Sequence, residues 1–239
     1  PFKPSQILCY YREVEQEPLI PFEHEVLFQD EHILVADKPH FLPVTPGGQY
    51  VNECLLERIR KQQKLPELVP LHRLDRETAG LVLFSVNPET RGLYSQLFAT
   101  KKISKSYQAV ALLTEEMIKQ SIPQQWKISN RLAKSKPSFI MCEVEGEINA
   151  QSTIKLIDIN DGLGKFELDP ITGKTHQLRL HMTKIGAPIL NDKFYPKLLA
   201  KKPLTFNSPL QLLAKKLYFI DPISGSRRQF ESQRLLESW

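Results

Sequence analysis

The sequence predicts an α+β fold built on a mixed, largely antiparallel sheet. Segments that alternate between apolar and polar residues adjoin helical segments without the strict strand–helix–strand rhythm of a parallel sheet. From Phe139 onward the pattern is mostly that of strands. With 239 residues, 41% of them hydrophobic, the chain is long enough to bury a sizeable core.

The first segment of the chain is punctuated by proline. Residues 1–25 carry prolines at positions 1, 4, 18 and 21, with charges of both signs between them. A segment of this length is too short for an independent fold. We therefore expect residues 1–25 to form an extension that packs on the main body, residues 26–239.

Strands alternate with helices in the first half of the main body. Runs of β-favouring residues bounded by turn signals predict strands over residues 25–28, 32–36, 81–86 and 105–112. The spacing of apolar residues predicts a helix over 51–64. Asn87-Pro88-Glu89 is typical of a helix start, and the helix that follows is expected to bury Leu93, Leu97 and Phe98.

The second half is expected to consist mostly of strands. Thr114 is expected to cap a short helix that ends at Gln120. The same strand criteria then apply to residues 139–145, 152–159, 164–169, 175–181 and 211–220. Short helices are expected over 181–185 and 194–202.

The composition narrows the class of protein. The three cysteines lie far apart and form no CxxC pair, so neither a disulfide framework nor a cysteine zinc site is expected. No segment approaches the ~20 apolar residues of a membrane-spanning helix, and the N-terminal residues do not resemble a signal peptide. We expect a cytoplasmic protein without membrane attachment. The net charge of +5 permits an anionic partner such as nucleic acid.

Three short motifs suggest functions that their surroundings exclude. TGKTH, residues 172–176, ends like a phosphate-binding P-loop, but Leu168 stands where that loop needs its first glycine. HRLD, residues 72–75, is similar to the kinase catalytic loop, but the chain has no glycine-rich loop and no DFG segment. His176 and His181 have no HExxH motif or acid-rich loop beside them, so no metal site is expected.

The densest mixed charge of the chain lies directly before an apolar strand. The stretch LHRLDRETAGL, residues 71–81, places Asp75 at the entry to that strand, where burial is expected. A buried carboxylate without a partner is costly, so Asp75 needs a cation. Arg179 is a candidate because it would lie on the polar face of the predicted strand 175–181. An arginine nearby would keep Asp75 ionised at neutral pH.

Four blocks of the sequence resemble one family, the RluA-type pseudouridine synthases. HRLDRETAGLVLF, residues 72–84, is similar to that family's HRLD signature. FQDEHILVADKPHFLPVTPGG resembles its upstream strand–turn–strand, KSYQAV its K-x-Y segment, and LDPITGKTHQLRLHMTKIGAPILNDKFY its third block. The resemblance runs in order from about residue 25 to residue 220. It indicates a form without the N-terminal S4 RNA-binding domain of many relatives, because residues 1–25 are too short for one.

The resemblance implies a fold, an activity and a set of site residues. The fold would be a mixed, largely antiparallel sheet, flanked by helices and loops, with a central basic cleft. The activity would be isomerisation of specific uridines to pseudouridine in structured RNA, either rRNA or tRNA, without cofactor or metal. We also expect a monomer, because nothing in the sequence suggests an obligate dimer. Asp75 matches the catalytic aspartate, Tyr107 the tyrosine against the target base, and Arg179 the arginine paired with the aspartate.

The resemblance and the basic character of the chain also imply RNA-binding residues. Arg73 matches the arginine that helps to displace the target base from its helix, a step that exposes the reacting atoms. Around it the RNA-binding side chains are expected to be His72, Arg76, Lys105, Lys174 and His176. His72 is also expected to make a structural hydrogen bond. Ala79, Lys174 and Asn191 depart from the family's usual serine, arginine and glycine, which bears on substrate choice more than on catalysis.

Two functions of other classes compete with this interpretation. A non-catalytic RNA-binding protein that kept the fold would carry a broken site, whereas Asp75, Tyr107 and Arg179 are all present. A glycoside hydrolase would need a second carboxylate across the scissile bond from Asp75, and Glu77 is the nearest acid in sequence.

Overall fold

The computed structural model describes residues 16–200 and 205–239. The strands are β1 (Glu25–Gln29), β2 (Ile33–Lys38), β3 (Val69–Pro70), β4 (Ala79–Ser85), β5 (Ile103–Leu112), β6 (Gln124–Lys134), β7 (Met141–Val144), β8 (Ala150–Asn160), β9 (Leu163–Pro170), β10 (Leu212–Ile220) and β11 (Arg227–Glu231). The helices are α1 (Leu55–Gln63), α2 (Arg91–Ala99), α3 (Glu115–Lys119) and α4 (Gln177–Lys184). None of these helices has the length and apolar character needed to cross a membrane.

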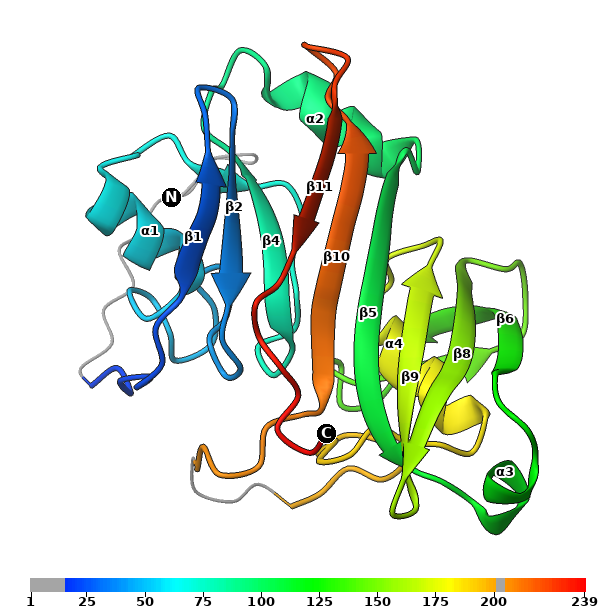
Figure 1. Ribbon diagram of the computed structural model, residues 1–239. Coiled ribbons are helices and arrows are strands. Elements are labelled where there is room, and N and C mark those ends of the chain that lie inside the picture. Colours follow the sequence, from blue (N-terminus) through cyan, green and yellow to red (C-terminus); the bar gives the residue numbers. More distant parts are fainter. Residues whose placement is uncertain (1–15, 201–204) are drawn as a thin grey trace, which may run out of the picture.

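All the strands belong to one curved sheet (Figure 1). Its order is β1-β2-β4-β10-β5-β9-β8-β6-β7, with β11 added to β10 and β3 to β4. Among the pairings of the described strands, only that of β4 with β10 is parallel. The predicted α+β class with a mixed, largely antiparallel sheet is therefore confirmed.

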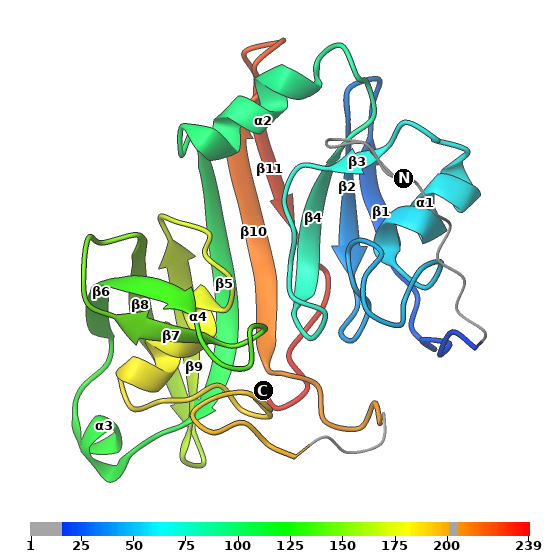
Figure 2. The same ribbon diagram turned by 180° about the vertical axis from the view of Figure 1, so that it is seen from behind.

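The sheet has two halves joined by a shared core. β1, β2 and β4 lie with α1 on one side of the molecule, and β8, β6 and β7 lie with α4 on the other, while β10 and β5 run between them (Figures 1 and 2). One cluster of buried side chains extends across both halves, from Leu34 and Phe84 to Ile154 and Phe166. The two halves are therefore packed as one body around the central strands.

A glycine allows the parallel pair at the centre of the sheet. Gly80, on β4, has a φ of +109°, a conformation that residues with a side chain rarely adopt. A Cβ atom there would lie 2.3 Å from the carbonyl oxygen of Ala214 on β10. Glycine at this position lets β10 approach the strand that follows the charged stretch 71–78.

The segment before β1 is hydrogen-bonded to the start of α1. The Glu17 carboxylate accepts from the amides of Val51, Asn52 and Glu53, at 2.5, 2.9 and 2.7 Å. Residues 51–54 form bends, so α1 begins at Leu55 and not at residue 51 as predicted. Residues 1–15 of the predicted extension lie outside the described residues.

Several other predicted elements are wrong. Of the predicted strand 175–181, residues 177–181 belong instead to α4, which also includes most of the predicted helix 181–185. His176 precedes this helix with a φ of +54°. Where the helix 194–202 is predicted, residues 194–197 form bends, residues 198–200 form no regular element, and residues 201 and 202 lie outside the described residues. In α2, Leu97 is buried as predicted, but the inward position one turn before it is taken by Tyr94, and Leu93 is 45% exposed.

Candidate active site

A cleft of about 960 Å³ lies between the two halves of the sheet. Its walls come from the loop 43–50, the stretch 71–78, β5, and the segments 148–151 and 170–179. Asp75 is the single carboxylate among the described residues that line it. The lysines and arginines of the lining are Arg73, Arg76, Lys101, Lys105, Lys174 and Arg179.

Backbone hydrogen bonds fix the loop that carries Asp75. The amide of Leu71 donates to the carbonyl of Leu83 at 2.9 Å, and the amide of Leu83 donates to His72 Nε2 at 3.1 Å. His72 therefore makes the structural hydrogen bond expected for it. Burial, followed by the charge of Lys105, lowers the pKa of His72 to about 3, so the ring stays a neutral acceptor. The Asp75 side chain, 26% exposed, is left facing the cleft.

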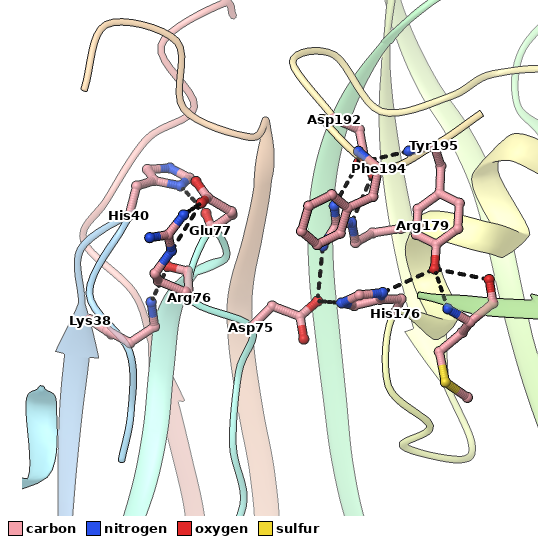
Figure 3. A network of polar contacts seen from close by, with 11 residues as sticks. Lys38, His40, Asp75, Arg76, Glu77, His176, Arg179, Asp192, Phe194 and Tyr195 are labelled. Carbon is pink, nitrogen blue, oxygen red and sulfur yellow. Dashed lines mark hydrogen bonds and ion pairs between the residues drawn. The ribbon is translucent and has the colours of Figure 1, made fainter. Parts of the chain in front are cut away.

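A buried lysine supports the same loop from below (Figure 3). Lys38 Nζ, at the end of β2, donates to the carbonyls of Pro39, Leu42 and Arg76, at 3.0, 2.7 and 3.1 Å. Burial lowers the pKa of Lys38 to about 7, although the charges of Glu77 and Asp75 act in the opposite direction. One ammonium group thus joins the exit of β2 to the residue that follows Asp75.

His40 fixes the next carbonyl of the loop. Its Nδ1 lies 2.7 Å from the carbonyl oxygen of Glu77, to which it donates a hydrogen bond. Burial lowers the pKa of His40 to about 4, so the ring makes this bond as a neutral group. Lys38 and His40 together hold two successive carbonyls of the loop, those of Arg76 and Glu77. Neither role was predicted from the sequence, in which the only signal was the Lys38-Pro39 pair of the block FQDEHILVADKPHFLPVTPGG.

Arg179 lies between two aspartates (Figure 3). Its guanidinium makes a two-point contact with Asp192, at 2.8 Å from Nε and 2.6 Å from Nη2, and its Nη1 is 3.5 Å from Asp75 Oδ2. Burial opposes the charge of Arg179, but the hydrogen bonds and the charge of Asp192 raise its pKa above the ordinary arginine value. The arginine is thus a permanent cation that Asp192 holds and that faces Asp75.

Aromatic rings close the arginine off from water. The guanidinium carbon lies 4.6 Å from the ring centre of Phe194 and 5.5 Å from that of Tyr195, and the Arg179 side chain is only 2% exposed. Asp192 Oδ1 also accepts from the amides of Phe194 and Tyr195, which fixes the carboxylate and both rings in one turn. Asp192 is a site residue that the sequence did not reveal, although it lies inside the block LDPITGKTHQLRLHMTKIGAPILNDKFY.

The departure at Asn191 has a structural explanation. Its φ is +65°, in the left-handed region where glycine is favoured and asparagine is tolerated. Its side chain donates to the carbonyl of Pro209 at 3.0 Å. Asparagine therefore keeps the turn that presents Asp192 to Arg179.

Two further predicted residues lie beside Asp75. His176 Nε2 is 3.9 Å from Asp75 Oδ2, and its Nδ1 is 3.0 Å from the hydroxyl of Tyr195. Tyr107, on β5, is 9% exposed and lines the cleft. Burial, followed by the charge of Asp75, raises the pKa of Tyr107, so its phenol is neutral at physiological pH.

The remaining predicted RNA-binding residues differ in their exposure and in whether protein groups already bind them. Arg73 and Lys174 are exposed on the cleft, and Lys105 is half-buried there, with a pKa that burial lowers. Arg76 instead pairs with Glu77 at 2.5 Å and donates to the hydroxyl of Tyr50 at 3.3 Å. The structure thus brings all nine predicted residues to one cleft, with His72, His176 and Arg76 already engaged by protein groups.

The chain is similar in sequence to one family of known proteins. Residues 32–184 match the model of the RNA pseudouridylate synthase family. The dual-specificity RNA pseudouridine synthase RluA of Haemophilus influenzae is 30% identical over 220 residues, which cover 90% of this chain and 95% of that protein. The RluA protein of Yersinia pestis is 31% identical over 214 residues, which cover 87% and 98% of the two chains.

Solved structures show the same fold. Human RNA Pseudouridylate Synthase Domain Containing 1 superposes with a TM-score of 0.70 at 20% identity, over 92% of this chain and 86% of that one. Human RNA Pseudouridylate Synthase Domain Containing 4 gives a TM-score of 0.65 at 23% identity, over 87% of each chain. With the family model matching well over half of the sequence, the chain belongs to the RNA pseudouridylate synthase family and is an RNA pseudouridine synthase.

Proposed function

We propose that the protein isomerises specific uridines to pseudouridine in structured rRNA or tRNA, with Asp75 as the catalytic aspartate and without a cofactor. One observation carries the proposal: Asp75 is the single carboxylate among the described cleft-lining residues, and it lies 3.5 Å from a buried arginine. An ionised carboxylate that faces a cavity and is held by a cation is a suitable nucleophile or base. The dual specificity in the names of the relatives is a reason to test both classes of RNA.

The reaction assigns a role to each neighbour of Asp75. It breaks the bond from C1′ to N1, turns the uracil and joins C1′ to C5; the proton on C5 is then lost and N1 gains one. Asp75 attacks or deprotonates the sugar, or adds to the base, and each route needs the ionised form that Arg179 favours. Tyr107, neutral and buried, is placed to lie against the base.

RNA binding is the proposed role of the exposed cations. Arg73 is exposed two residues before Asp75, where it can fill the space that the flipped uridine leaves. Lys105 and Lys174 line the cleft and can contact phosphates. Glycoside hydrolysis is disfavoured because Glu77, the second acid that it would need, pairs with Arg76 and does not line the cleft.

Tritium release tests the proposal directly. The protein is incubated with tRNA and with rRNA that carry tritium at uracil C5, and release into water is measured. Release by the wild-type protein from at least one RNA, and none by Asp75→Ala, is expected. Equal release from both proteins would sink the assignment of Asp75. Mapping pseudouridine in RNA from cells with and without the protein then identifies the modified position.

We also propose that residues 16–25, the described part of the N-terminal extension, pack on the catalytic domain and stabilise it. Besides Glu17, Arg58 on α1 binds this segment, donating to the carbonyls of Ile20 and Phe22 at 2.7 Å each. Ile20 is 2% exposed. Glu17 binds amides of residues 51–53, which come immediately after the cleft-lining loop 43–50. The segment therefore restrains the position of this loop, which forms one wall of the cleft.

Glu17→Gln is expected to lower the free energy of unfolding by about 1–3 kcal/mol, the usual range for weakening hydrogen bonds to a charged group. The neutral amide accepts more weakly than the carboxylate and faces the three amides with a donor as well as an acceptor. Chemical denaturation measures the change, and the KM for RNA is expected to rise with kcat unchanged. Glu23→Gln, an exposed charge change on the same segment, is the control. Equal stabilities of the two variants would contradict a supporting role.

A further inference from the structure

The hydroxyl of Tyr195 has more partners than it has protons. His176 Nδ1 lies at 3.0 Å, the amide of Met141 at 2.9 Å and the carbonyl of Met141 at 3.1 Å (Figure 3). A phenol has one proton to donate and two lone pairs that accept. The Met141 amide can only donate and its carbonyl can only accept. The one open question is whether the hydroxyl donates to the carbonyl or to the histidine.

The strand register shows why the backbone amide and carbonyl of Met141 take Tyr195, and not β6, as their hydrogen-bond partner. The amide of Ser135 donates to the carbonyl of Ile140 at 2.8 Å, so Ser135 lies at a hydrogen-bonded position of this ladder, although the amide of Ile140 donates to the carbonyl of Pro137 instead. The next pair, Lys134 with Met141, is then of the non-hydrogen-bonded kind. The amide and carbonyl of Met141 therefore point away from β6, toward Tyr195.

Only one pattern of protons satisfies all four groups. If the hydroxyl donates to the Met141 carbonyl, it accepts from the Met141 amide and from a proton on His176 Nδ1. If it donates to His176 instead, the half-buried Met141 carbonyl loses the hydrogen bond that the Tyr195 hydroxyl gives it in the structure, and this loss favours the first pattern. His176 therefore carries its proton on Nδ1. Burial lowers the pKa of His176, so the ring is neutral and Nε2 is bare.

The bare nitrogen is directed at the catalytic carboxylate. Nε2 is 3.9 Å from Asp75 Oδ2, and the His176 side chain is 7% exposed. The charged groups around the ring are Asp75 and Asp192 on one hand and Arg179 on the other. While Asp75 is ionised, no proton lies between the two groups. Once Asp75 carries a proton, its O–H has an acceptor within a short movement.

We propose that His176 is a positioning residue for Asp75: Tyr195 holds the imidazole as the Nδ1–H tautomer, and the free Nε2 accepts a hydrogen bond from Asp75 when that carboxyl is protonated. The proton leaves a carbon of the uridine, its former C–H electron pair stays with the substrate, and the new O–H bond forms on Asp75. The proton remains on Asp75 until a later step removes it, and nothing is oxidised or reduced. The catalytic part of this inference rests on the proposed function, whereas the tautomer does not.

Nuclear magnetic resonance tests the tautomer without any RNA. In protein labelled with ¹⁵N at histidine, the ring signals of His176 are assigned by their loss in His176→Asn. At pH 7.5 we expect Nδ1 to show the shift of a protonated nitrogen and Nε2 that of a bare one. Tyr195→Phe is expected to remove this preference. A wild-type ring protonated at Nε2 alone would overturn the proposal, whatever the activity.

Single-turnover kinetics test the effect on Asp75. Tyr195→Phe is expected to slow tritium release about tenfold, the rate change that corresponds to the loss of one hydrogen bond, with RNA affinity unchanged. Tyr218→Phe, on an exposed face of β10, is the control and is expected to match the wild type. A wild-type rate in Tyr195→Phe would overturn the role of His176. Absence of release from every RNA by the wild type would instead count against the proposed function and leave the tautomer result standing.

Discussion

Asp192→Asn is expected to cost the protein stability and activity together, whereas Asp75→Asn is expected to cost activity alone. Both carboxylates face Arg179, but Asp192 makes the two close contacts, at 2.8 and 2.6 Å, and its side chain is 1% exposed. In Asp192→Asn one of these contacts becomes a donor facing a donor. Breaking a buried ion pair typically costs about 3–5 kcal/mol, because a charge stays buried without its partner.

Asp75→Asn leaves that pair intact. Its side chain is 26% exposed and 3.5 Å from Arg179, so the free energy of unfolding is expected to change by less than about 1 kcal/mol. Tritium release is expected to fall by at least about 1,000-fold, as when a group that performs the chemistry is removed. Urea denaturation and release assays measure both variants, with the exposed Asp158→Asn as control. Equal losses of stability in the two variants would contradict the prediction that Asp192 stabilises the fold whereas Asp75 serves catalysis alone.

Lys38→Met is expected to lower the free energy of unfolding by about 2 kcal/mol or more at pH 7, and the rate of tritium release by at least tenfold. The substitution keeps the volume but leaves the carbonyls of Pro39, Leu42 and Arg76 without their donor. An unsatisfied buried carbonyl costs about 1–3 kcal/mol. The activity falls because Arg76 directly follows Asp75, and a shift of about 1 Å at a reacting group can cost about 100-fold.

The same lysine predicts how the stability of the wild type depends on pH. Its pKa is about 7 in the folded protein and 10.5 ordinarily, so between these values the unfolded chain binds more protons. Stability is then expected to rise with pH through this window, by up to about 1.4 kcal/mol per unit. Denaturation from pH 6 to 10 checks this against Lys38→Met, in which the rise becomes shallower although Lys105 still contributes to it, and Lys119→Met, in which the rise stays. A rise of equal slope in Lys38→Met would exclude the lysine as its source.

The pairing of Asp75 with Arg179 could be predicted from residue chemistry, whereas the element that carries Arg179 could not. Residues 175–181 alternate in polarity as a half-buried strand does, yet they belong to α4. Here polarity is no guide to exposure, because Gln177, Arg179 and His181 are all buried. Each has a polar partner inside the protein, and for Arg179 it is Asp192, a contact that no local pattern encodes.

The rest of the site depends on contacts between distant segments. The burial of Lys38 follows from the loop 71–78 folding over the end of β2, and the role of Tyr195 follows from the register of β6 and β7. β6 itself was missed, although Trp126, Ile128 and Leu132 alternate along it as strand residues do. In contrast, the Thr114 cap and β10 lie where they were predicted, because both depend on short-range patterns.

The parallel pairing of β4 with β10 has a consequence for the order of events during synthesis. β4 ends at Ser85, whereas β10 starts at Leu212, so most of the chain must leave the ribosome before β4 gains its central neighbour. Contacts between such distant segments form slowly, since a long loop must close first. The sheet beneath the Asp75 loop therefore stays incomplete until β10 has docked, and we expect modification of RNA to begin only after that step.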